Sequence, residues 1–210
     1  MGFIERPPKW FRRMCGTALF RVKARPGERP TVYITFDDGP IPESTPWVLD
    51  MLDRYGVKAT FFMVGDNVRK YPELYEEVRR RGHKVGNHTM HHLQGWLKWT
   101  KHYVRDVEEA AQYIDSDLFR PPHGWLRPMQ NIVLKRRYRI VMFDLVTRDY
   151  SWRLSAEEVV GNVKENARQG SIIVFHDSLK SMARLREALP ESLEWLKEAG
   201  YSFGVLDSSR

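Results

Sequence analysis

The chain lacks the features that mark disulfide-rich, membrane-spanning and multidomain proteins. Its 210 residues include a single cysteine, Cys15, which excludes a framework of intramolecular disulfides. No apolar run reaches the roughly 18–20 residues that a membrane-spanning helix requires. The chain also has no repeat of fixed period and no low-complexity or linker-like stretch. These absences favour one globular domain of ordinary size, large enough to bury a substantial core.

The N-terminal region lacks a convincing export signal. Basic residues precede a weakly apolar run at 14–20, but further basic residues interrupt the run and no small-residue cleavage site follows. We therefore expect residues 1–30 to form a packed basic arm ahead of a main domain at 31–210. A cytoplasmic location is favoured, with the cell envelope as the alternative. Peripheral contact of the basic arm with a membrane surface, as an amphipathic helix, is also left open.

Acidic residues are fewer than basic ones. The 34 Lys and Arg against 27 Asp and Glu give a formal charge of +7, and a positive surface attracts anionic partners such as nucleic acid, anionic glycans or membranes. The densest basic runs, 79–81 and 135–137, both lie in stretches with helical periodicity. We interpret them as solvated helix faces, and we expect no nucleic-acid partner.

Short apolar runs alternate with longer amphipathic ones from residue 31 onward. The runs rich in β-branched and aromatic residues predict strands at 31–36, 58–64, 83–85, 118–119, 139–146, 171–175 and 201–206. Helical periodicity with start and stop signals predicts helices at 46–55, 72–81, 103–114, 128–137, 156–168 and 184–199. Strands joined by crossover helices indicate an α/β fold with a parallel sheet, either doubly wound or closed into a barrel.

Polar side chains follow the predicted strands at the points where the strands end. They form five groups: Asp37-Asp38-Gly39-Pro40, Asn87 to His92, Arg120 to Gly124, Asp149-Tyr150 and His176-Asp177. Because functional groups gather at the carboxyl ends of parallel strands, these five groups predict a single functional site.

Two histidines and a carboxylate form a candidate metal site. His88 and His92 are four residues apart, which would place both imidazoles on one face of a helical turn, and Asp38 would complete a ligand set with open positions. Adjacent Asp37 and Asp38 resist joint ionisation, and a bound cation resolves that conflict for one of them. A solvated acidic turn is the alternative for this pair. Structural or surface roles are expected for three other histidines: His83, His91 and His102.

His176 follows a strand apolar enough to be buried. A histidine at such a strand end can serve as a general acid, because its pKa is easily tuned near neutrality. The alternative is a structural histidine hydrogen-bonded to the backbone.

These groups resemble the motifs of the polysaccharide deacetylases of carbohydrate esterase family 4, the NodB-homology domain. The resemblance extends from about Thr31 to Leu206, and its first two motifs are the most specific. The five motifs, in chain order, are Thr35-Phe36-Asp37-Asp38-Gly39-Pro40, His88-Thr89-x-x-His92, Arg120-x-Pro122-x-Gly124, Asp149-Tyr150 and Val174-Phe175-His176. It implies that residues 31–210 are a catalytic domain, folded as a distorted (β/α) barrel with fewer than eight repeats.

The resemblance also implies a set of roles. Asp37 would be the general base and His176 the general acid. Arg120 would position the base, and Asp149 would orient the acid. A divalent metal, expected to be Zn²⁺ with Co²⁺, Mn²⁺, Ni²⁺ or Fe²⁺ as alternatives, would be held by Asp38, His88 and His92. Substrate contacts are expected from Pro122, His123, Gly124, Trp125 and Tyr150.

Two positions depart from the family pattern. Position 123 is His where an aromatic residue is usual, and position 150 is Tyr where Trp is common. The backbone N–H of His123 is expected to bind the oxyanion, so the change would alter substrate contacts more than chemistry. Four tryptophans near the motifs are candidates for stacking on sugar rings: Trp96, Trp99, Trp125 and Trp152.

The implied reaction is removal of N-acetyl groups from N-acetylhexosamine-containing saccharides, chitin-like or peptidoglycan-like. One alternative is an O-acetyl esterase acting on xylan-type glycans. A second is a non-haem iron oxygenase, which shares the two-His, one-carboxylate set but needs no second Asp beside it. A third is a non-catalytic glycan-binding module, in which the base and acid positions would have no purpose.

Overall fold

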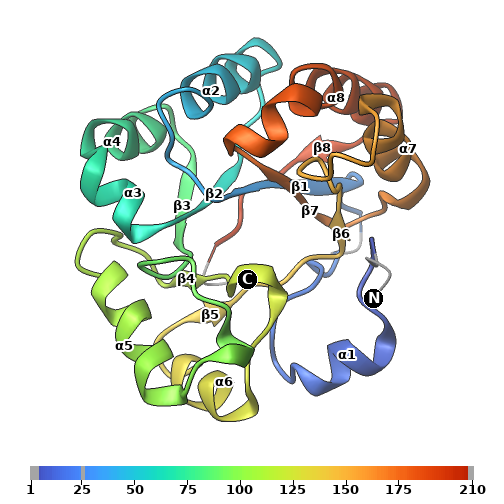
Figure 1. Ribbon diagram of the computed structural model, residues 1–210. Helices are drawn as coiled ribbons and strands as arrows, with labels where there is room; N and C mark the ends of the chain where they lie inside the picture. The colour runs from blue at the N-terminus through green and yellow to red at the C-terminus, as the bar shows by residue number, and fades with distance from the viewer. Residues whose placement is uncertain (1–4, 25–26, 208–210) are drawn as a thin grey trace.

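Parallel strands curl into an incomplete barrel in the computed structural model, which describes residues 5–24 and 27–207 (Figure 1). The strands are β1 (Thr31–Asp37), β2 (Thr60–Met63), β3 (Lys84–Asn87), β4 (Leu118–Phe119), β5 (Arg139–Ile140), β6 (Leu145–Val146), β7 (Ile172–His176) and β8 (Ser202–Phe203). Seven of them lie in the order β5-β4-β3-β2-β1-β7-β6, and β8 pairs with the first residues of β1. The predicted distorted barrel is confirmed.

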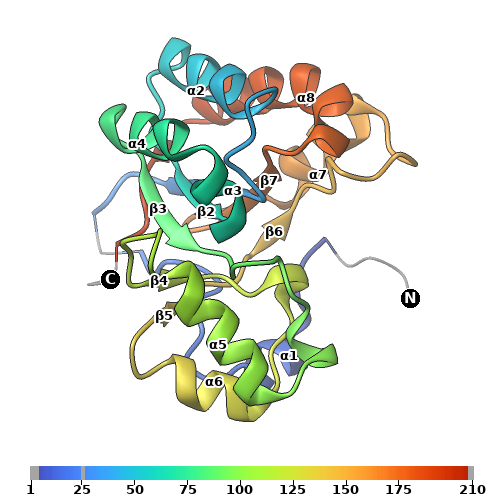
Figure 2. The same cartoon turned by 60° about the vertical axis from the view of Figure 1, so that its left-hand side comes forward.

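Helices surround the strands, as Figures 1 and 2 show. They are α1 (Lys9–Met14), α2 (Thr45–Arg54), α3 (Gly65–Lys70), α4 (Pro72–Arg80), α5 (Thr100–Ala110), α6 (Pro128–Leu134), α7 (Ala156–Asn166) and α8 (Leu179–Glu198), with 3-10 turns η1 (Gly95–Leu97) and η2 (Pro122–Gly124). α7 begins where the sequence supplies a cap, because Ser155 Oγ accepts from the N–H of Glu158 and the Glu158 carboxylate accepts from the N–H of Ser155. None of the described helices is long and apolar enough to cross a bilayer.

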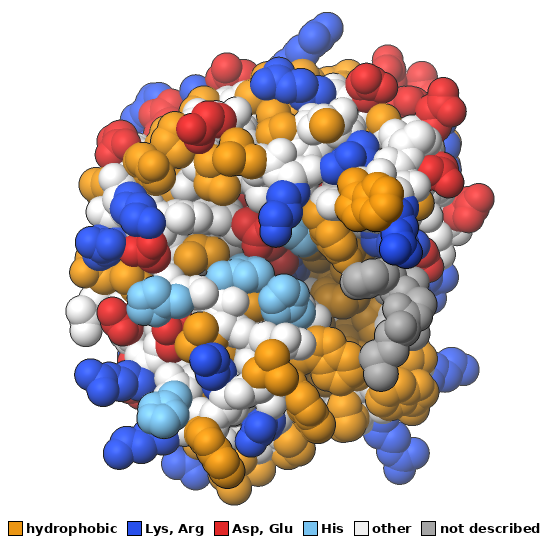
Figure 3. Space-filling model, in the orientation of Figure 1, with side chains coloured by type: hydrophobic (Ala, Val, Ile, Leu, Met, Phe, Trp, Pro, Cys, Tyr) orange, Lys and Arg blue, Asp and Glu red, His pale blue; other side chains and the backbone are white. Residues whose placement is uncertain are grey.

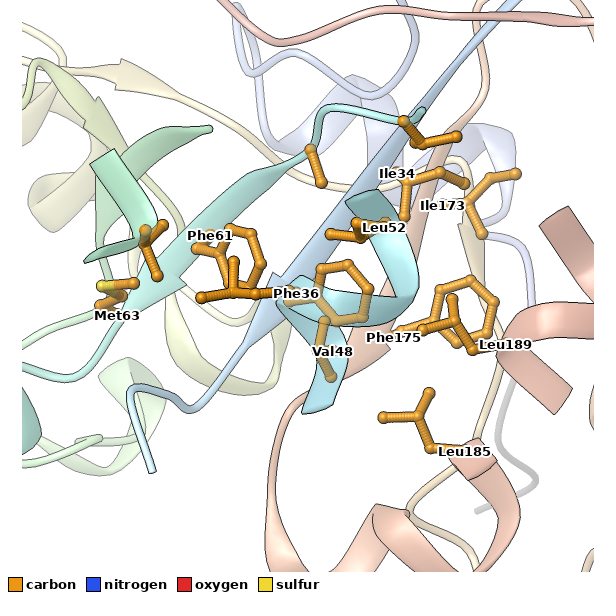
Figure 4. Close-up of a cluster of buried hydrophobic side chains, with 14 of the residues drawn as sticks. Ile34, Phe36, Val48, Leu52, Phe61, Met63, Ile173, Phe175, Leu185 and Leu189 are labelled. Atoms are coloured by element: carbon orange, nitrogen blue, oxygen red, sulfur yellow. The ribbon is translucent and has the colours of Figure 1, made fainter. Parts of the chain in front are cut away.

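Strict alternation of side chains along the strands separates two cores. In β1, Ile34 and Phe36 point outward to the helices and belong to the largest hydrophobic cluster, in which Phe36 stacks between Phe61 and Phe175 at centroid distances of 5.0 and 6.0 Å (Figure 4). Inward positions of the strands form a smaller core with residues that follow β5 and β8: Tyr33, Phe62, Leu118 and Ile172 from the strands, and Val141 and Leu206 beyond them. The outer cluster fastens α2, α4, α7 and α8 to the sheet.

The N-terminal arm fills the side of the barrel where one predicted strand is split. The expected strand at 139–146 is wrong, because β5 ends at Ile140 and β6 begins only at Leu145. Between them the chain pairs with the arm: the N–H of Leu19 donates to the carbonyl of Ile140, and the N–H of Met142 donates to the carbonyl of Leu19, both at 2.8 Å. The backbone bonds of an edge strand are thus satisfied by residues more than 100 positions earlier in the chain.

A buried carboxylate anchors this arm. Asp144 is fully buried and accepts from the guanidinium of Arg12 at 2.6 Å, from Arg168 at 2.6 and 2.8 Å, and from Ser171 Oγ at 2.8 Å. The hydrogen bonds from the two arginines outweigh the opposing effect of burial and hold the pKa of Asp144 well below its usual range. Residues 1–4 and 25–26 of the predicted arm lie outside the described residues.

Candidate active site

The alternation that builds the inner core also aims four polar side chains into the mouth of the barrel. Asp37 ends β1 and is the register partner of His176 in β7, so the two side chains project from the same face. His88 lies two positions beyond the inward Gly86 of β3, and Arg120 two positions beyond the inward Leu118. In Figure 3, histidine side chains in pale blue gather near the middle of this face, beside red carboxylates.

Asp38, His88 and His92 bring three ligand atoms together. Each of these residues offers one nitrogen or carboxylate oxygen, and the three atoms lie within 4.8 Å of one another. Nε2 of His92 is 3.1 Å from Oδ1 of Asp38, and Nε2 of His88 is 3.9 Å from the same oxygen. Two imidazoles and a carboxylate at this spacing form a candidate metal site, as expected from the sequence.

The route by which the histidines converge differs from the expected one. Residues 88–92 form no helical turn but a loop after β3, in which Thr89 has φ +66° and His92 has φ +53°. The two rings nevertheless lie 5.1 Å apart. The prediction of a helical turn was wrong because i, i+4 spacing also permits convergence through a tight loop, which spacing alone does not distinguish.

His88 has one nitrogen committed to the protein and the other available. Its Nδ1 lies 2.7 Å from the carbonyl oxygen of Arg120, which can only accept, so this nitrogen carries the proton and Nε2 has a free lone pair. Burial disfavours the imidazolium and lowers the pKa of His88 to about 4 despite the nearby Asp37. A neutral ring with a fixed tautomer is the form that binds metals.

A buried arginine holds Asp37. Nη1 of Arg120 donates to Oδ1 of Asp37 at 2.6 Å and to Thr35 Oγ1 at 2.8 Å, and Nη2 donates to the carbonyl of Met142 at 3.1 Å. The guanidinium also lies 4.0 Å above the ring of Phe62. Because Arg120 is only 1 % exposed, its ion pair with Asp37 is shielded from solvent and has one defined geometry.

His176 is held by Asp149 at two points. One carboxylate oxygen accepts from the backbone N–H of His176 at 2.8 Å, and the other lies 2.7 Å from the ring Nδ1. Burial lowers the pKa of His176, but Asp149, with smaller contributions from Asp38 and Asp37, outweighs it and raises the pKa to about 9. The ring is therefore protonated at neutral pH, with Nδ1 directed to Asp149 and Nε2 left to donate.

Left-handed backbone conformations are concentrated in the loops that carry these side chains. In the described ranges, the non-glycine residues with positive φ, between +53° and +85°, are Asp38, Thr89, His92, His123 and Arg148. Such conformations are costly for residues with a Cβ and persist only where the surroundings enforce them. Each of the five lies in one of the strand-end groups or directly beside it, so the strain is localised at the site.

Asp177 shapes the Asp38 turn, a role that the sequence motifs did not reveal. Its fully buried carboxylate accepts from the N–H of Gly39 at 3.1 Å and from Thr45 Oγ1 at 2.6 Å. A Cβ at position 39 would lie 2.1 Å from Asp177 Oδ2, so only glycine permits this approach. Burial raises the pKa of Asp177 to about 8. Its placement directly after His176 was the available signal.

Asp106 is a second residue that sequence analysis missed. This buried side chain of α5 accepts from the N–H groups of Met90 and His91, and its other oxygen lies 2.6 Å from Nδ1 of His91. It thereby fastens the loop that carries His88 and His92. Nothing in the motif pattern marks it, because Asp106 looks like an ordinary polar helix position.

The remaining histidines lie outside the triad, as expected. His83 is 4 % exposed, its Nδ1 accepts the N–H of Ala59, and burial lowers its pKa to about 4. His91 is engaged by Asp106, and His102 is exposed on α5.

Two of the residues expected to contact substrate lie beside histidines of the site. The ring of His123 is 4.9 Å from that of His92, and the ring of Tyr150 is 4.8 Å from that of His176. Pro122 and Gly124 are buried beside His123 in η2. The half-buried Trp125 contacts Phe11 of α1 at 5.1 Å and Trp96 at 6.2 Å. Two further tryptophans are largely exposed: Trp99 at 74 % and Trp152 at 79 %.

The sequence is similar to those of known deacetylases. The family model for polysaccharide deacetylases matches residues 24–137. A peptidoglycan-N-acetylglucosamine deacetylase of Bacillus cereus is 34% identical over 185 residues, which cover 85% of this chain and 87% of that protein. A chitooligosaccharide deacetylase of Azorhizobium caulinodans is 34% identical over 155 residues, covering 70% and 73%.

The fold is similar to that of solved enzymes as well. The crystal structure of a peptidoglycan N-acetylglucosamine deacetylase superimposes with a TM-score of 0.80 at 30% identity, covering 90% of this chain and 91% of that one. The chain belongs to the polysaccharide deacetylase family, carbohydrate esterase family 4.

Proposed function

We propose that this protein is a metal-dependent deacetylase that hydrolyses N-acetyl groups of N-acetylglucosamine-containing glycans. One observation carries the proposal: the two adjacent aspartates have different partners. Asp38 faces His88 and His92, whereas Asp37 is paired with Arg120 and lies in register with His176. One carboxylate is thus available to a metal and the other to a proton.

The triad fits a divalent metal. The fixed tautomer of His88 leaves its Nε2 free, and the ligand atoms that His88, His92 and Asp38 offer all lie within 4.8 Å of one another. Two imidazole nitrogens and one carboxylate oxygen suit Zn²⁺, which we propose as the resident ion. A bound metal of this kind supplies a lowered pKa for water and a positive charge for a developing oxyanion.

The residues around the triad supply the remaining chemistry. Asp37 accepts the proton of the attacking water, because its ion pair with Arg120 fixes the carboxylate beside the triad. The backbone N–H of His123 donates a hydrogen bond to the oxyanion and would act together with the positive charge of the metal, since η2 places this residue against His92.

His176 completes the reaction by donating a proton to the sugar nitrogen. An amine anion cannot leave, so the leaving nitrogen must be protonated as the C–N bond breaks. Asp149 opposes the effect of burial and raises the pKa of His176, which favours the protonated ring. The Asp37–Arg120 pair would serve as the base and the His176–Asp149 pair as the acid. Neither pair has a role in an iron oxygenase or in a simple glycan-binding module, which argues against both alternatives.

The proposed substrate class is supported by the substrates named for the relatives and by the acid His176. The named relatives act on peptidoglycan N-acetylglucosamine and on chitooligosaccharides. A positioned imidazolium also matters more for an amine leaving group than for the alcohol that an acetylated xylan releases. We therefore place N-acetylglucosamine polymers or oligomers ahead of O-acetylated xylans.

Acetate release tests this proposal. The zinc-loaded protein is compared on N-acetylglucosamine oligomers, purified peptidoglycan and acetylated xylan at matched acetyl concentration, with Asp37→Asn as the inactive control. We expect faster release from the N-acetylated substrates. Faster release from xylan would overturn the substrate class, and no release from any of them would overturn the deacetylase assignment.

A further inference from the structure

Three segments of the chain carry basic residues and no acidic ones. Residues 6–24, 91–105 and 118–143 contain fifteen Lys and Arg and no Asp or Glu. By sequence alone the basic charge looks dispersed, because the segments are separated by more than sixty and by twelve residues. Their absence of carboxylates becomes significant only if the segments lie together in the fold.

The structure brings these segments side by side. α1, α5 and α6 contribute to one hydrophobic cluster, and aromatic contacts link Phe11 to Trp125 and Trp125 to Trp96 of η1. The guanidinium of Arg127 donates to the carbonyl of Trp96, at 2.7 and 3.0 Å. The side chain of Asn131 on α6 donates to the carbonyl of Cys15 after α1 at 3.3 Å. Figure 2 shows α1 and α6 together at one end of the molecule.

The joined segments expose an unusual share of apolar surface. Of the ten large hydrophobic side chains that are exposed among the described residues, seven come from these segments. Six of them define what we call the apolar-basic face: Trp10, Met14, Leu97, Trp99, Met129 and Ile132. Exposures are 62 % for Trp10, 70 % for Leu97 and 74 % for Trp99. In Figure 3, orange and blue side chains dominate the lower right of the molecule, whereas red ones are concentrated in the upper half.

Exposed cations lie close to these apolar side chains along the chain. Lys9 and Arg13 flank Trp10 on α1, Lys98 and Lys101 flank Trp99, and Lys135 and Arg136 follow α6. We propose that the apolar-basic face binds the surface of an anionic lipid bilayer, with the tryptophans and aliphatic side chains at the level of the headgroups and the lysines and arginines on the lipid phosphates. Trp together with Lys and Arg is the composition that favours the membrane interface.

The apolar side chains favour a lipid surface over an anionic polymer. An anionic glycan would stack sugar rings on a tryptophan such as Trp99 but would leave the aliphatic Leu97 and Ile132 in water, whereas a bilayer removes all three from it. The face also adjoins the candidate active site, because Trp125 follows η2 and η2 carries His123 beside His92. Membrane-bound protein would therefore present its site to glycan close to the lipid surface.

Vesicle binding of the full chain tests the proposal. Vesicles of phosphatidylcholine containing about one third phosphatidylglycerol are compared with vesicles of phosphatidylcholine alone, by flotation at low and high ionic strength. We expect binding to the anionic vesicles only, weakened by salt. Replacing both exposed tryptophans, Trp10→Ser with Trp99→Ser, should lower the partition coefficient about tenfold or more. Reversing two charges, Lys9→Glu with Arg13→Glu, should lower it at least as much.

Matched controls separate this face from general effects. Trp152→Ser removes an equally exposed tryptophan from another loop, and Arg54→Glu with Arg186→Glu makes the same change of net charge on α2 and α8. Both controls should bind vesicles within about twofold of the unchanged protein. Circular dichroism checks that each variant is folded.

Three results would overturn the proposal. These are absence of binding to anionic vesicles, equal losses in the control variants, and binding that tolerates loss of the tryptophans while a soluble polyanion competes fully. The last result would identify the face as a polyanion site instead.

Discussion

The carboxylate of Asp149 contacts His176 at two points, the backbone N–H at 2.8 Å and the ring Nδ1 at 2.7 Å. Arg184 holds the backbone of Asp149 in place, because its Nε donates to the main-chain carbonyl of Asp149 at 2.7 Å. The ring therefore has one orientation, and its positive charge is stabilised by a partner that is itself fully buried.

Asp149→Asn should move the alkaline limb of the pH–rate profile to lower pH. Asp149 is the largest influence that raises the pKa of His176, so its loss lowers that pKa, and the protonated acid then disappears at a lower pH. A shift of about 1–3 units is expected for loss of one adjacent charge. The profile of kcat/KM on an N-acetylglucosamine oligomer measures it, and an unmoved alkaline limb would contradict the assignment of His176 as the acid.

Removal of the acid should distinguish amide from ester substrates. In His176→Ala, turnover on N-acetylglucosamine oligomers should fall by about 10²–10⁴-fold, since the amine leaves only when protonated. Activated aryl acetates have leaving groups that need little protonation, and their hydrolysis should fall far less. Comparable losses on both substrates would instead indicate a structural histidine.

Substitution of the two adjacent aspartates should have different effects on the metal content of the protein. Asp37→Asn removes the proton acceptor but leaves Asp38, His88 and His92 in place, so zinc content should stay near that of the unchanged protein while activity is lost. Asp38→Asn should lose metal as well as activity, because it removes a ligand. Elemental analysis after dialysis provides the readout. Equal metal loss in both variants would contradict the assignment of Asp37 as the proton acceptor and Asp38 as the metal ligand.

Asp144→Asn should destabilise the fold by about 2–4 kcal/mol at neutral pH. Breaking a buried ion pair usually costs more, but Arg12 and Arg168 are 26% and 40% exposed and solvent screens part of the effect. The pKa of Asp144 is lowered on folding, so its contribution is complete above pH ~4 and is lost as pH falls through the folded-state value.

Urea unfolding at neutral and acidic pH tests this linkage. The gap between Asp144→Asn and the unchanged protein should narrow on acidification. A gap below about 1 kcal/mol, or one independent of pH, would show that the carboxylate does not anchor the arm.

The site was largely predictable because its residues stand at fixed distances from recognisable strands. Asp37, His88, Arg120 and His176 all continue the inward-facing parity of a strand, and that parity is a property of the local sequence. The helical turn proposed for residues 88–92 failed because a four-residue spacing is compatible with more than one backbone path. The single strand at 139–146 failed because apolar composition does not reveal where an edge strand exchanges its partner.

The amino-acid sequence by itself determined which side chains are chemically active, on which strands they lie, and that they meet at one end of a parallel sheet, because side-chain alternation and motif chemistry are local. Only the tertiary structure decided their partners. Three contacts of this kind join segments that are separated in the chain. They are the contact of Asp177 with Gly39, that of Asp106 with the loop of His88 and His92, and that of Asp144 with Arg12 of the arm. The apolar-basic face is of the same kind, since its segments become a single surface only when α1 and α6 pack together. Such contacts are selected by the packing of the whole chain, and no local pattern encodes them.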